Sequence, residues 1–356
     1  MNYKFLIYFS YSYAIPTGIP LELEINRRGH EVWWFCDQET QKNSIPSTSN
    51  SFDSIKEVIT YAPHIVLTIT DLVPDFISGL KVQIFHGFDP EKRSFKKGHC
   101  RIRGLFDLYC SQGPSTTKVF KIHQQTKPHF EVIETGWSKV DPLFPLAFKT
   151  NNTAPIIFVA STFSKRLSLA YNDDVHAEIA QLAVSKKYQF LMVLHPKLPK
   201  EIKEKWIQLE GDYFTYYDTT DLIPLMKKAD MMFSDTTSAI QEFGLQDKPI
   251  VTFNHFVPKP YLINVTEANA IEVAFQKALS YPKEILELLT TYNKQLHPYQ
   301  DGNSSKRVIE ACIEFLHRDK SYLIKKPLNL VRRYQIRKHL NHFTFKSFRK
   351  PFTLKK

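Results

Sequence analysis

The chain has 356 residues, of which 43% are hydrophobic and 23% are charged. This length exceeds what one hydrophobic core usually serves, and the composition excludes pervasive disorder, collagen-like repeats and a coiled coil along the whole chain. The net charge of +11 comes from 47 Lys and Arg against 36 Asp and Glu, and residues 321–356 hold 11 basic and no acidic residues. The chain before residue 321 is therefore formally neutral, and the tail carries the whole excess.

Short apolar runs alternate with stretches of helical length from the start of the chain. In the first part, strands are expected at Lys4–Phe9, Glu31–Cys36, His64–Ile69, Val82–Phe85, Leu105–Cys110 and Phe130–Glu134. The opening run is predicted to be the first strand and not a signal peptide, because it is short and no small-residue cleavage site follows it. A helix is predicted at Leu21–Arg28, where Gly29 allows a left-handed C-cap.

The second part repeats this alternation. Strands are expected at Ile156–Ala160, Phe190–Leu194, Tyr213–Tyr217, Met231–Phe233 and Ile250–Phe253, with helices at Asp173–Ser185, Leu222–Lys228 and Thr237–Leu245. Nearly continuous apolar strands separated by helices indicate α/β domains with parallel sheets covered on both faces. No apolar stretch approaches the ~20 residues that span a bilayer.

The segment Ser138–Asn152 is rich in Pro, Asn and Thr and lacks periodicity, which favours a linker. We therefore expect an N-terminal domain over residues 1–145 and a C-terminal domain over residues 146–320. A basic, aromatic tail over residues 321–356 follows.

Several common sites are absent from the sequence. The four cysteines form no C-x-x-C pair, which indicates reduced thiols and no zinc site. There is no Gly-rich phosphate loop of either common pattern and no Asp-x-Asp pair. We therefore expect neither a metal nor a cofactor.

Polar residues directly follow three of the predicted strands. They are His86 before Gly87, His195 before Pro196, and the cluster Ser234–Ser238. Ligands of open parallel sheets bind beyond the carboxyl ends of the strands. A histidine there can accept a proton from an attacking hydroxyl, or neutralise a phosphate when protonated. The structural alternative is a turn histidine bonded to nearby backbone.

The cluster after the third strand resembles an anion site. A helix that begins at Thr236 or Thr237 would point unpaired amide groups out of the sheet edge, and the hydroxyls would add donors. The alternative is capping by Ser234 or Asp235, and both can hold together. Because Asp235 would repel a phosphate, we expect it to cap the helix.

A second predicted anion site precedes the helix at Val308–Leu316. Asp301-Gly302 leads into it through Ser304, Ser305, Lys306 and Arg307. Cations in a first helical turn oppose the helix dipole, which favours a bound anion there. An ordinary solvated helix start is the alternative.

Taken in order, these motifs resemble the CDP-glycerol glycerophosphotransferase family, whose members build teichoic-acid-like polymers. The resemblance depends on the order of the motifs and spans roughly residues 80 to 316. The motifs are His86-Gly87, Thr135-Gly136-Trp137, Ser161-Thr162-Phe163, His195-Pro196, Ser234 to Glu242, Lys248-Pro249-Ile250 and Asp301-Gly302.

The resemblance implies a GT-B architecture, in which two Rossmann-like domains with parallel sheets face a central cleft. Residues 1–145 would form the acceptor-side domain, and residues 146–320 would form the nucleotide-donor domain. It implies transfer of a phosphoglycerol or related phosphopolyol unit from a CDP-activated donor to a hydroxyl of a cell-surface glycan or lipid-linked acceptor. His86 would be the base, His195 would assist it at the donor phosphates, and Glu242 and Thr162 would contact the nucleotide. The expected donor phosphate-binding residues are Ser234, Thr236, Thr237, Ser238, Ser304, Ser305, Lys306 and Arg307.

The sequence also departs from the family pattern. Phe88, Glu91 and the pair Ser138-Lys139 differ from the family's residues, which leaves the acceptor and the donor polyol open. The segment Ser234–Pro249 also resembles UDP-N-acetylglucosamine 2-epimerases and nucleotide-sugar glycosyltransferases, which are the alternative function. A non-catalytic sugar-binding module is a further alternative.

The tail interleaves its basic residues with Phe343, Phe345, Phe348 and Phe352. Cations near an anionic leaflet and aromatic rings at its interface favour peripheral binding to the inner, cytoplasmic face of the cell membrane. The alternatives are a solvated tail and a helix that returns to the first domain. A nucleic-acid partner is disfavoured, because no basic patch is evident outside the tail.

Overall fold

The computed structural model describes residues 1–85, 87, 101–146 and 154–343. The chain forms two compact units, Met1–Pro142 with Gln295–Lys356, and Leu143–Lys294. The first boundary lies close to the predicted residue 145. Residues 295–320, expected in the second domain, instead belong to the first unit, because the helix they contain packs on the first sheet.

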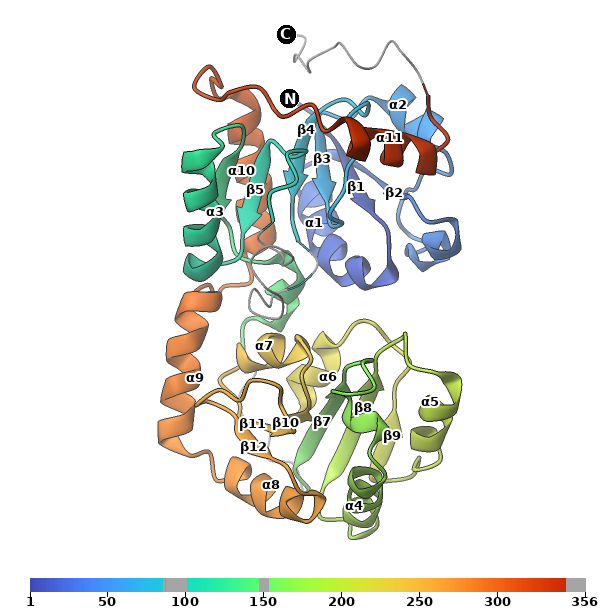
Figure 1. Cartoon of the computed structure of the whole chain (residues 1–356), viewed down its shortest axis with the longest axis vertical. Helices are drawn as coiled ribbons and strands as arrows, with labels where there is room; N and C mark the ends of the chain where they lie inside the picture. Colours follow the sequence, from blue (N-terminus) through green and yellow to red (C-terminus); the bar gives the residue numbers. More distant parts are fainter. Residues whose placement is uncertain (86, 88–100, 147–153, 344–356) are drawn as a thin grey trace. The chain divides into compact units, whose positions relative to one another are not determined.

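The first unit is built on a parallel sheet with the strand order β2-β1-β3-β4-β5-β6 (Figure 1). Each strand overlaps the run predicted for it. The strands are β1 (Lys4–Phe9), β2 (Glu31–Cys36), β3 (Ile65–Thr68), β4 (Leu80–Gln83), β5 (Leu108–Ser111) and β6 (Glu131–Glu134). Phe5 and Ile7 of β1 enter the core on one face, and Leu6 and Tyr8 enter the core on the other.

Helices cover both faces of this sheet. Ile25 of α1 and Phe315 of α10 belong to the core on one face, whereas Phe120 of α3 and Ile336 of α11 belong to the core on the other. This is the covering that continuous apolar strands predict. The helices of the unit are α1 (Ile15–Arg27), α2 (Ile55–Tyr61), α3 (Pro114–Thr126), α10 (Ser304–His317) and α11 (Leu330–His339).

The C-terminal helix α11 supplies part of the covering that the β3–β4 connection lacks. Residues 69–79, between those strands, contain no helix. Ile336 of α11 is buried in the core on this face. The guanidinium of Arg337, next to it, is buried, donates to the carboxylate of Asp75 at 2.8 Å and lies 4.8 Å from the ring centroid of Phe76. The helix is therefore part of the first unit.

Other contacts also join the tail to the first unit. The ammonium of Lys326 lies 2.6 Å from the carboxylate of Asp107. The ring of His339 lies 2.8 Å from the carbonyl oxygen of Asp37. The described part of the tail thus follows the alternative of a helix returning to the first domain. Phe345, Phe348 and Phe352 lie outside the described residues.

The second unit repeats the architecture with the strand order β12-β11-β10-β7-β8-β9 (Figure 1). Its strands are β7 (Ile156–Ser161), β8 (Gln189–Leu194), β9 (Phe214–Tyr216), β10 (Met231–Ser234), β11 (Ile250–Phe253) and β12 (Ile263–Val265). Its helices are α4 (Asp173–Val184), α5 (Lys200–Ile207), α6 (Ile223–Lys228), α7 (Ala239–Gly244), α8 (Ile271–Leu279) and α9 (Lys283–Leu296), which runs to the end of the unit. No helix in the described ranges is long and apolar enough to cross a bilayer.

Replacing Asp75 with Ala should loosen α11 from the first sheet. The change leaves the buried guanidinium of Arg337 without its carboxylate, and removing one partner of a buried ion pair costs about 3–5 kcal/mol. Hydrogen exchange followed by mass spectrometry should then show faster exchange in β3 and β4. As a control, Glu310→Ala removes a surface pair with Arg28 and should cost less than about 1 kcal/mol. Unchanged exchange in the Asp75 variant would contradict this role of α11.

Candidate functional site

The order of the strands in the second sheet reverses between β7 and β10. The chain proceeds from β7 outward to β8 and β9, then continues on the other side of β7 with β10, β11 and β12. In open parallel sheets, ligands bind beyond the carboxyl ends of the strands at such a reversal. Thr162 follows β7 and Asp235 follows β10. The residues predicted to bind the nucleotide donor therefore begin at the two strand ends that border the reversal.

The buried carboxylate of Asp235 joins these two strand ends. It accepts hydrogen bonds from the hydroxyl of Ser161 at 2.5 Å and from the backbone amides of Thr162 and Leu169, each at 3.0 Å. Burial raises the pKa of Asp235 from 3.8 to about 6, and these hydrogen bonds oppose that increase. The prediction that Asp235 caps the helix is wrong: α7 begins at Ala239 and has no side-chain cap. Asp235 instead holds the loop of residues 162–169.

The hydroxyl groups after β10 differ in their roles. Ser234 is buried and donates to the carbonyl of Ala160 at 2.6 Å, so its proton is used inside the sheet. The hydroxyl of Thr236 accepts from the backbone amide of Phe256 at 3.0 Å, and that of Thr237 accepts from Ala239 at 3.4 Å. A hydroxyl that accepts in this way keeps its own proton for donation to an anion. Thr236 and Thr237 therefore suit a phosphate better than Ser234 does.

His195 follows β8 and lies against the loop that Asp235 holds. Its Nδ1 accepts from the backbone amide of Lys197 at 3.1 Å, which in the neutral ring leaves the proton on Nε2. Its ring centroid lies 4.6 Å from that of Phe163, and the ammonium of Lys197 lies 5.4 Å from the same Phe163 ring. Arg166, in the same loop, stacks its guanidinium over Phe256 at 5.3 Å. Two cations and an imidazole N–H are thus brought to this edge of the sheet.

The other predicted residues are placed as follows. Thr162 and Glu242 are buried in the second unit, at 4% and 3% exposure. Ser238 is the residue immediately before α7. His86 lies outside the described residues. The residues Ser304 to Arg307 belong to the first unit, whereas Thr162, His195, Ser234 to Ser238 and Glu242 belong to the second.

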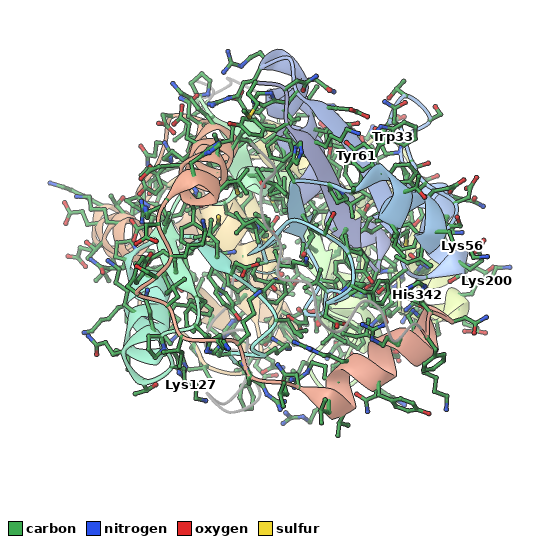
Figure 2. All side chains as sticks on the ribbon, turned by 90° about the horizontal axis from the view of Figure 1, so that it is seen from above. Trp33, Lys56, Tyr61, Lys127, Lys200 and His342 are labelled. Atoms are coloured by element: carbon green, nitrogen blue, oxygen red, sulfur yellow. The ribbon has the colours of Figure 1, made fainter. Side chains whose placement is uncertain are left out.

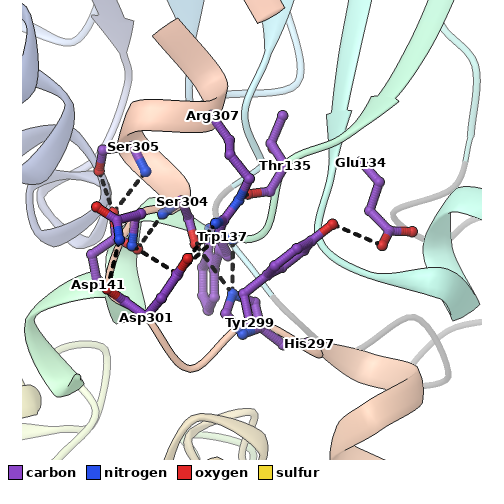
Figure 3. A network of polar contacts seen from close by, with 11 residues as sticks. Glu134, Thr135, Trp137, Asp141, His297, Tyr299, Asp301, Ser304, Ser305 and Arg307 are labelled. Carbon is purple, nitrogen blue, oxygen red and sulfur yellow. Dashed lines mark hydrogen bonds and ion pairs between the residues drawn. The ribbon is translucent and has the colours of Figure 1, made fainter. Parts of the chain in front are cut away.

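The start of α10 does hold an anion, but that anion is a side chain of the protein. The carboxylate of Asp141 accepts from the backbone amides of Ser304 and Ser305, at 2.8 and 2.7 Å, and from the Ser305 hydroxyl at 2.5 Å (Figure 3). Both serines are buried. Their donors are engaged, so we assign Ser304 and Ser305 to holding Asp141 and not to a donor phosphate.

Arg307, one of the two cations predicted at this helix start beside the exposed Lys306, also pairs within the chain. Arg307 donates to the carboxylate of Asp301 at 2.8 Å and to the carbonyl of Thr135 at 2.8 Å, and its guanidinium lies 3.9 Å from the ring centroid of Tyr299 (Figure 3). Nearby, Nε2 of His297 accepts from the backbone amide of Trp137 at 3.1 Å. Burial, together with Arg307, lowers the pKa of His297 to about 4. These contacts fasten residues 135–141 to residues 297–307 within the first unit.

Comparison with known proteins assigns the chain to a family. A family model described as CDP-glycerol:poly(glycerophosphate) glycerophosphotransferase matches residues 30–256. The chain belongs to this family. It is thus an enzyme of the CDP-glycerol glycerophosphotransferase type. A comparison with curated proteins finds no match.

Solved structures with similar folds agree with a GT-B fold for this glycerophosphotransferase. The wall teichoic acid polymerase TagF is similar with a TM-score of 0.67 and 12% identity, covering 88% of this chain and 88% of that chain. UDP-GlcNAc 2-epimerase from Neisseria meningitidis, bound to UDP-GlcNAc, is similar with a TM-score of 0.59 and 15% identity, covering 87% of this chain and 100% of that chain. At these identities the likeness shows the fold alone, whereas the family match separates the transferase from the epimerase alternative.

The glycerophosphotransferase match covers some of the predicted site residues and not others. His86, His195, the turn after β10 and Glu242 lie within residues 30–256. Residues 304–307 lie beyond that range, in the helix whose start Asp141 occupies. Lys197 and Arg166 were not among the predicted residues, although Lys197 stands two residues after His195 and could have been found from that spacing.

Replacing Asp235 with Asn should weaken donor binding by the glycerophosphotransferase. The NH2 group of the asparagine would face at least one of the N–H or O–H groups that now donate to the carboxylate. A buried N–H group without a hydrogen-bond partner costs about 1–3 kcal/mol. We expect the KM for the donor to rise roughly tenfold as the 162–169 loop loosens. Asp230→Asn is the matched control, since buried Asp230 accepts the amide of Ile156 at 2.8 Å at the opposite end of the same strands. An equal rise in KM for both variants would show a general loss of stability and contradict the specific role of Asp235.

Proposed function

We propose that this enzyme transfers phosphoglycerol, or a related phosphopolyol unit, from a CDP-activated donor to a hydroxyl of a cell-surface glycan or lipid-linked acceptor. The observation that carries the proposal is the edge of the second sheet where β7 and β10 end. There, the buried carboxylate of Asp235 is used by the loop of residues 162–169, and two threonine hydroxyls follow it in the turn. The imidazole of His195 and the ammonium of Lys197 lie against Phe163 of that loop, which also carries Arg166. This chemistry suits a diphosphate.

In the proposed reaction, the acceptor oxygen attacks the phosphorus distal to the nucleoside. A new P–O bond forms to the acceptor, the bond from that phosphorus to the bridging oxygen breaks, and CMP leaves. His86 accepts the proton of the attacking hydroxyl, as the family resemblance implies. His195 donates from Nε2 to a phosphate oxygen, and the hydroxyls of Thr236 and Thr237 add donors. Such transfer needs mainly positioning and charge stabilisation, which side chains can supply.

We also propose that the enzyme works at the cytoplasmic face of the cell membrane, where a lipid-linked acceptor would be presented. The support is the charge distribution, since residues 321–356 carry 11 basic and no acidic residues on a body that is formally neutral. Anionic lipid attracts such a segment.

Replacing each of the two histidines with Ala should show which one is the base and which one binds phosphate. His86→Ala should lower kcat by a factor of roughly 100 or more, with the Kd for the donor little changed, because a base acts on the acceptor. His195→Ala should raise the Kd for the donor, because it removes an N–H donor to phosphate. Steady-state kinetics with donor-binding calorimetry measures both effects, and His123→Ala, on α3 of the first unit, serves as a control. Wild-type turnover in the His86 variant would exclude it as the base.

The donor class can be tested by thermal unfolding with a panel of nucleotides. CDP-glycerol or CDP-ribitol should raise the melting temperature, because a ligand that binds only the folded state stabilises it. UDP-N-acetylglucosamine should raise it little. Stabilisation by the UDP-sugar alone would overturn the proposed donor and favour a nucleotide-sugar glycosyltransferase.

A further inference from the structure

The helix α11 has its charged side turned inward. Arg337 is buried at 1% exposure and pairs with Asp75, and the guanidinium of Arg333 lies 3.8 Å from the same carboxylate. Arg332 donates to the carbonyl of Arg103 at 3.0 Å. An amphipathic helix on a folded domain usually presents the opposite arrangement, with apolar residues inward and charges in water. The first unit therefore uses most of the arginines of α11 for its own packing.

The outer side of α11 carries exposed apolar residues, together with the exposed Gln335 and Lys338. Leu330, Val331 and Tyr334 are 61%, 73% and 57% exposed, and their spacing places them on one side of the helix. Leu328, just before the helix, is 69% exposed, and Phe343, just after it, is 57% exposed. The rings of Tyr334 and Phe343 lie 5.9 Å apart. We call these five residues the outer face of α11.

Exposed apolar side chains that lie next to one another mark an interaction surface, whereas single exposed apolar residues are ordinary. In Figure 2, α11 lies along the periphery of the first unit, and His342 is labelled near its C-terminal end. Lys325 and Lys338, which flank the outer face, are both exposed. Lys56 of α2 lies near His342 (Figure 2). Burial lowers the pKa of His342, and the charges of Arg337 and Lys56 lower it further. Cations around an apolar strip match a surface that is negatively charged above an apolar layer.

We propose that the outer face of α11 docks on an anionic lipid bilayer, with Leu330, Val331 and Tyr334 entering the interface and the flanking lysines contacting the headgroups. This rests on the proposed location at the membrane and names the surface responsible. A bilayer is the occupant that fits best, because it supplies negative charge and an apolar layer together. The docking uses α11 as it stands in the folded unit, with Arg333 and Arg337 still paired to Asp75.

The test uses the full chain and vesicles of phosphatidylcholine with or without phosphatidylglycerol. The wild type should co-sediment with the anionic vesicles, and less so with neutral vesicles or at high salt. The triple variant Leu330→Gln, Val331→Gln and Tyr334→Gln should bind roughly tenfold more weakly, because it removes apolar side chains from the interface and keeps every charge. The matched control, Leu23→Gln, Val184→Gln and Val273→Gln, removes three side chains of 64%, 81% and 67% exposure from other helices and should bind as the wild type does.

Depth can be measured directly by replacing Tyr334 with Trp and using lipids with brominated acyl chains. Bromine should quench the fluorescence of this tryptophan more than in a Val273→Trp variant, because only the former enters the interface. Equal quenching at the two positions, or undiminished binding of the triple variant, would overturn the proposal.

Further outcomes distinguish this proposal from the proposed function. Transfer to a water-soluble acceptor should be equal in the wild type and the triple variant, so loss of transfer chemistry and loss of docking are separate results. If deletion of residues 344–356 abolishes vesicle binding while the triple variant does not, the outer face is not the docking surface. Binding of single-stranded RNA in place of vesicles, or a dimer by ultracentrifugation that only the triple variant loses, would also overturn the proposal.

Discussion

At the carboxyl end of β10, the buried carboxylate of Asp235 accepts hydrogen bonds from the hydroxyl that ends β7 and from two backbone amides of the segment that follows it. The interaction has two consequences for an anionic ligand. It takes the acidic group out of the edge where phosphates would bind, and it fixes the loop that carries Phe163 and Arg166. The geometry of the candidate site in the second unit depends on this group, since His195 is packed against the same loop.

A carboxylate of the chain plays a comparable part in the first unit. Asp141 occupies the start of α10, where two amides and a hydroxyl converge. The general argument that a helix start attracts an anion is therefore correct here, but the chain supplies the anion. The bonds fasten α10 to residues just before the boundary at Pro142, and so fix the segment that returns from the second unit. These bonds add to the apolar packing that places α10 on the first sheet.

The sequence predicted the strands and the alternation well, because buried parallel strands leave a continuous apolar signal. It predicted the contacts of polar side chains less well, because each of them has several possible partners. Asp141 lies in a stretch without periodicity, and nothing local indicates that its partners stand at residues 304 and 305. Asp235 carries the signature of a helix cap, but tertiary contacts with Thr162 and Leu169 decide its role. The buried place of Arg337 could not be read from a basic tail, because it depends on Asp75, far away in sequence.

The pairing of Arg337 with Asp75 also bears on how much of the tail's charge can act on a membrane. Of its basic residues, Lys326, Arg332, Arg333 and Arg337 contact the first unit, so a count of charges overstates what this segment offers to an anionic surface. A lysine near an anionic leaflet contributes about 1 kcal/mol, and full burial of a large apolar side chain contributes about 1.5–3 kcal/mol. With the arginines turned inward, the outer face of α11 consists of apolar side chains, and its affinity for a membrane should depend on them more than on the salt concentration. The ion pairs that hold α11 in place are thus also what exposes its apolar side.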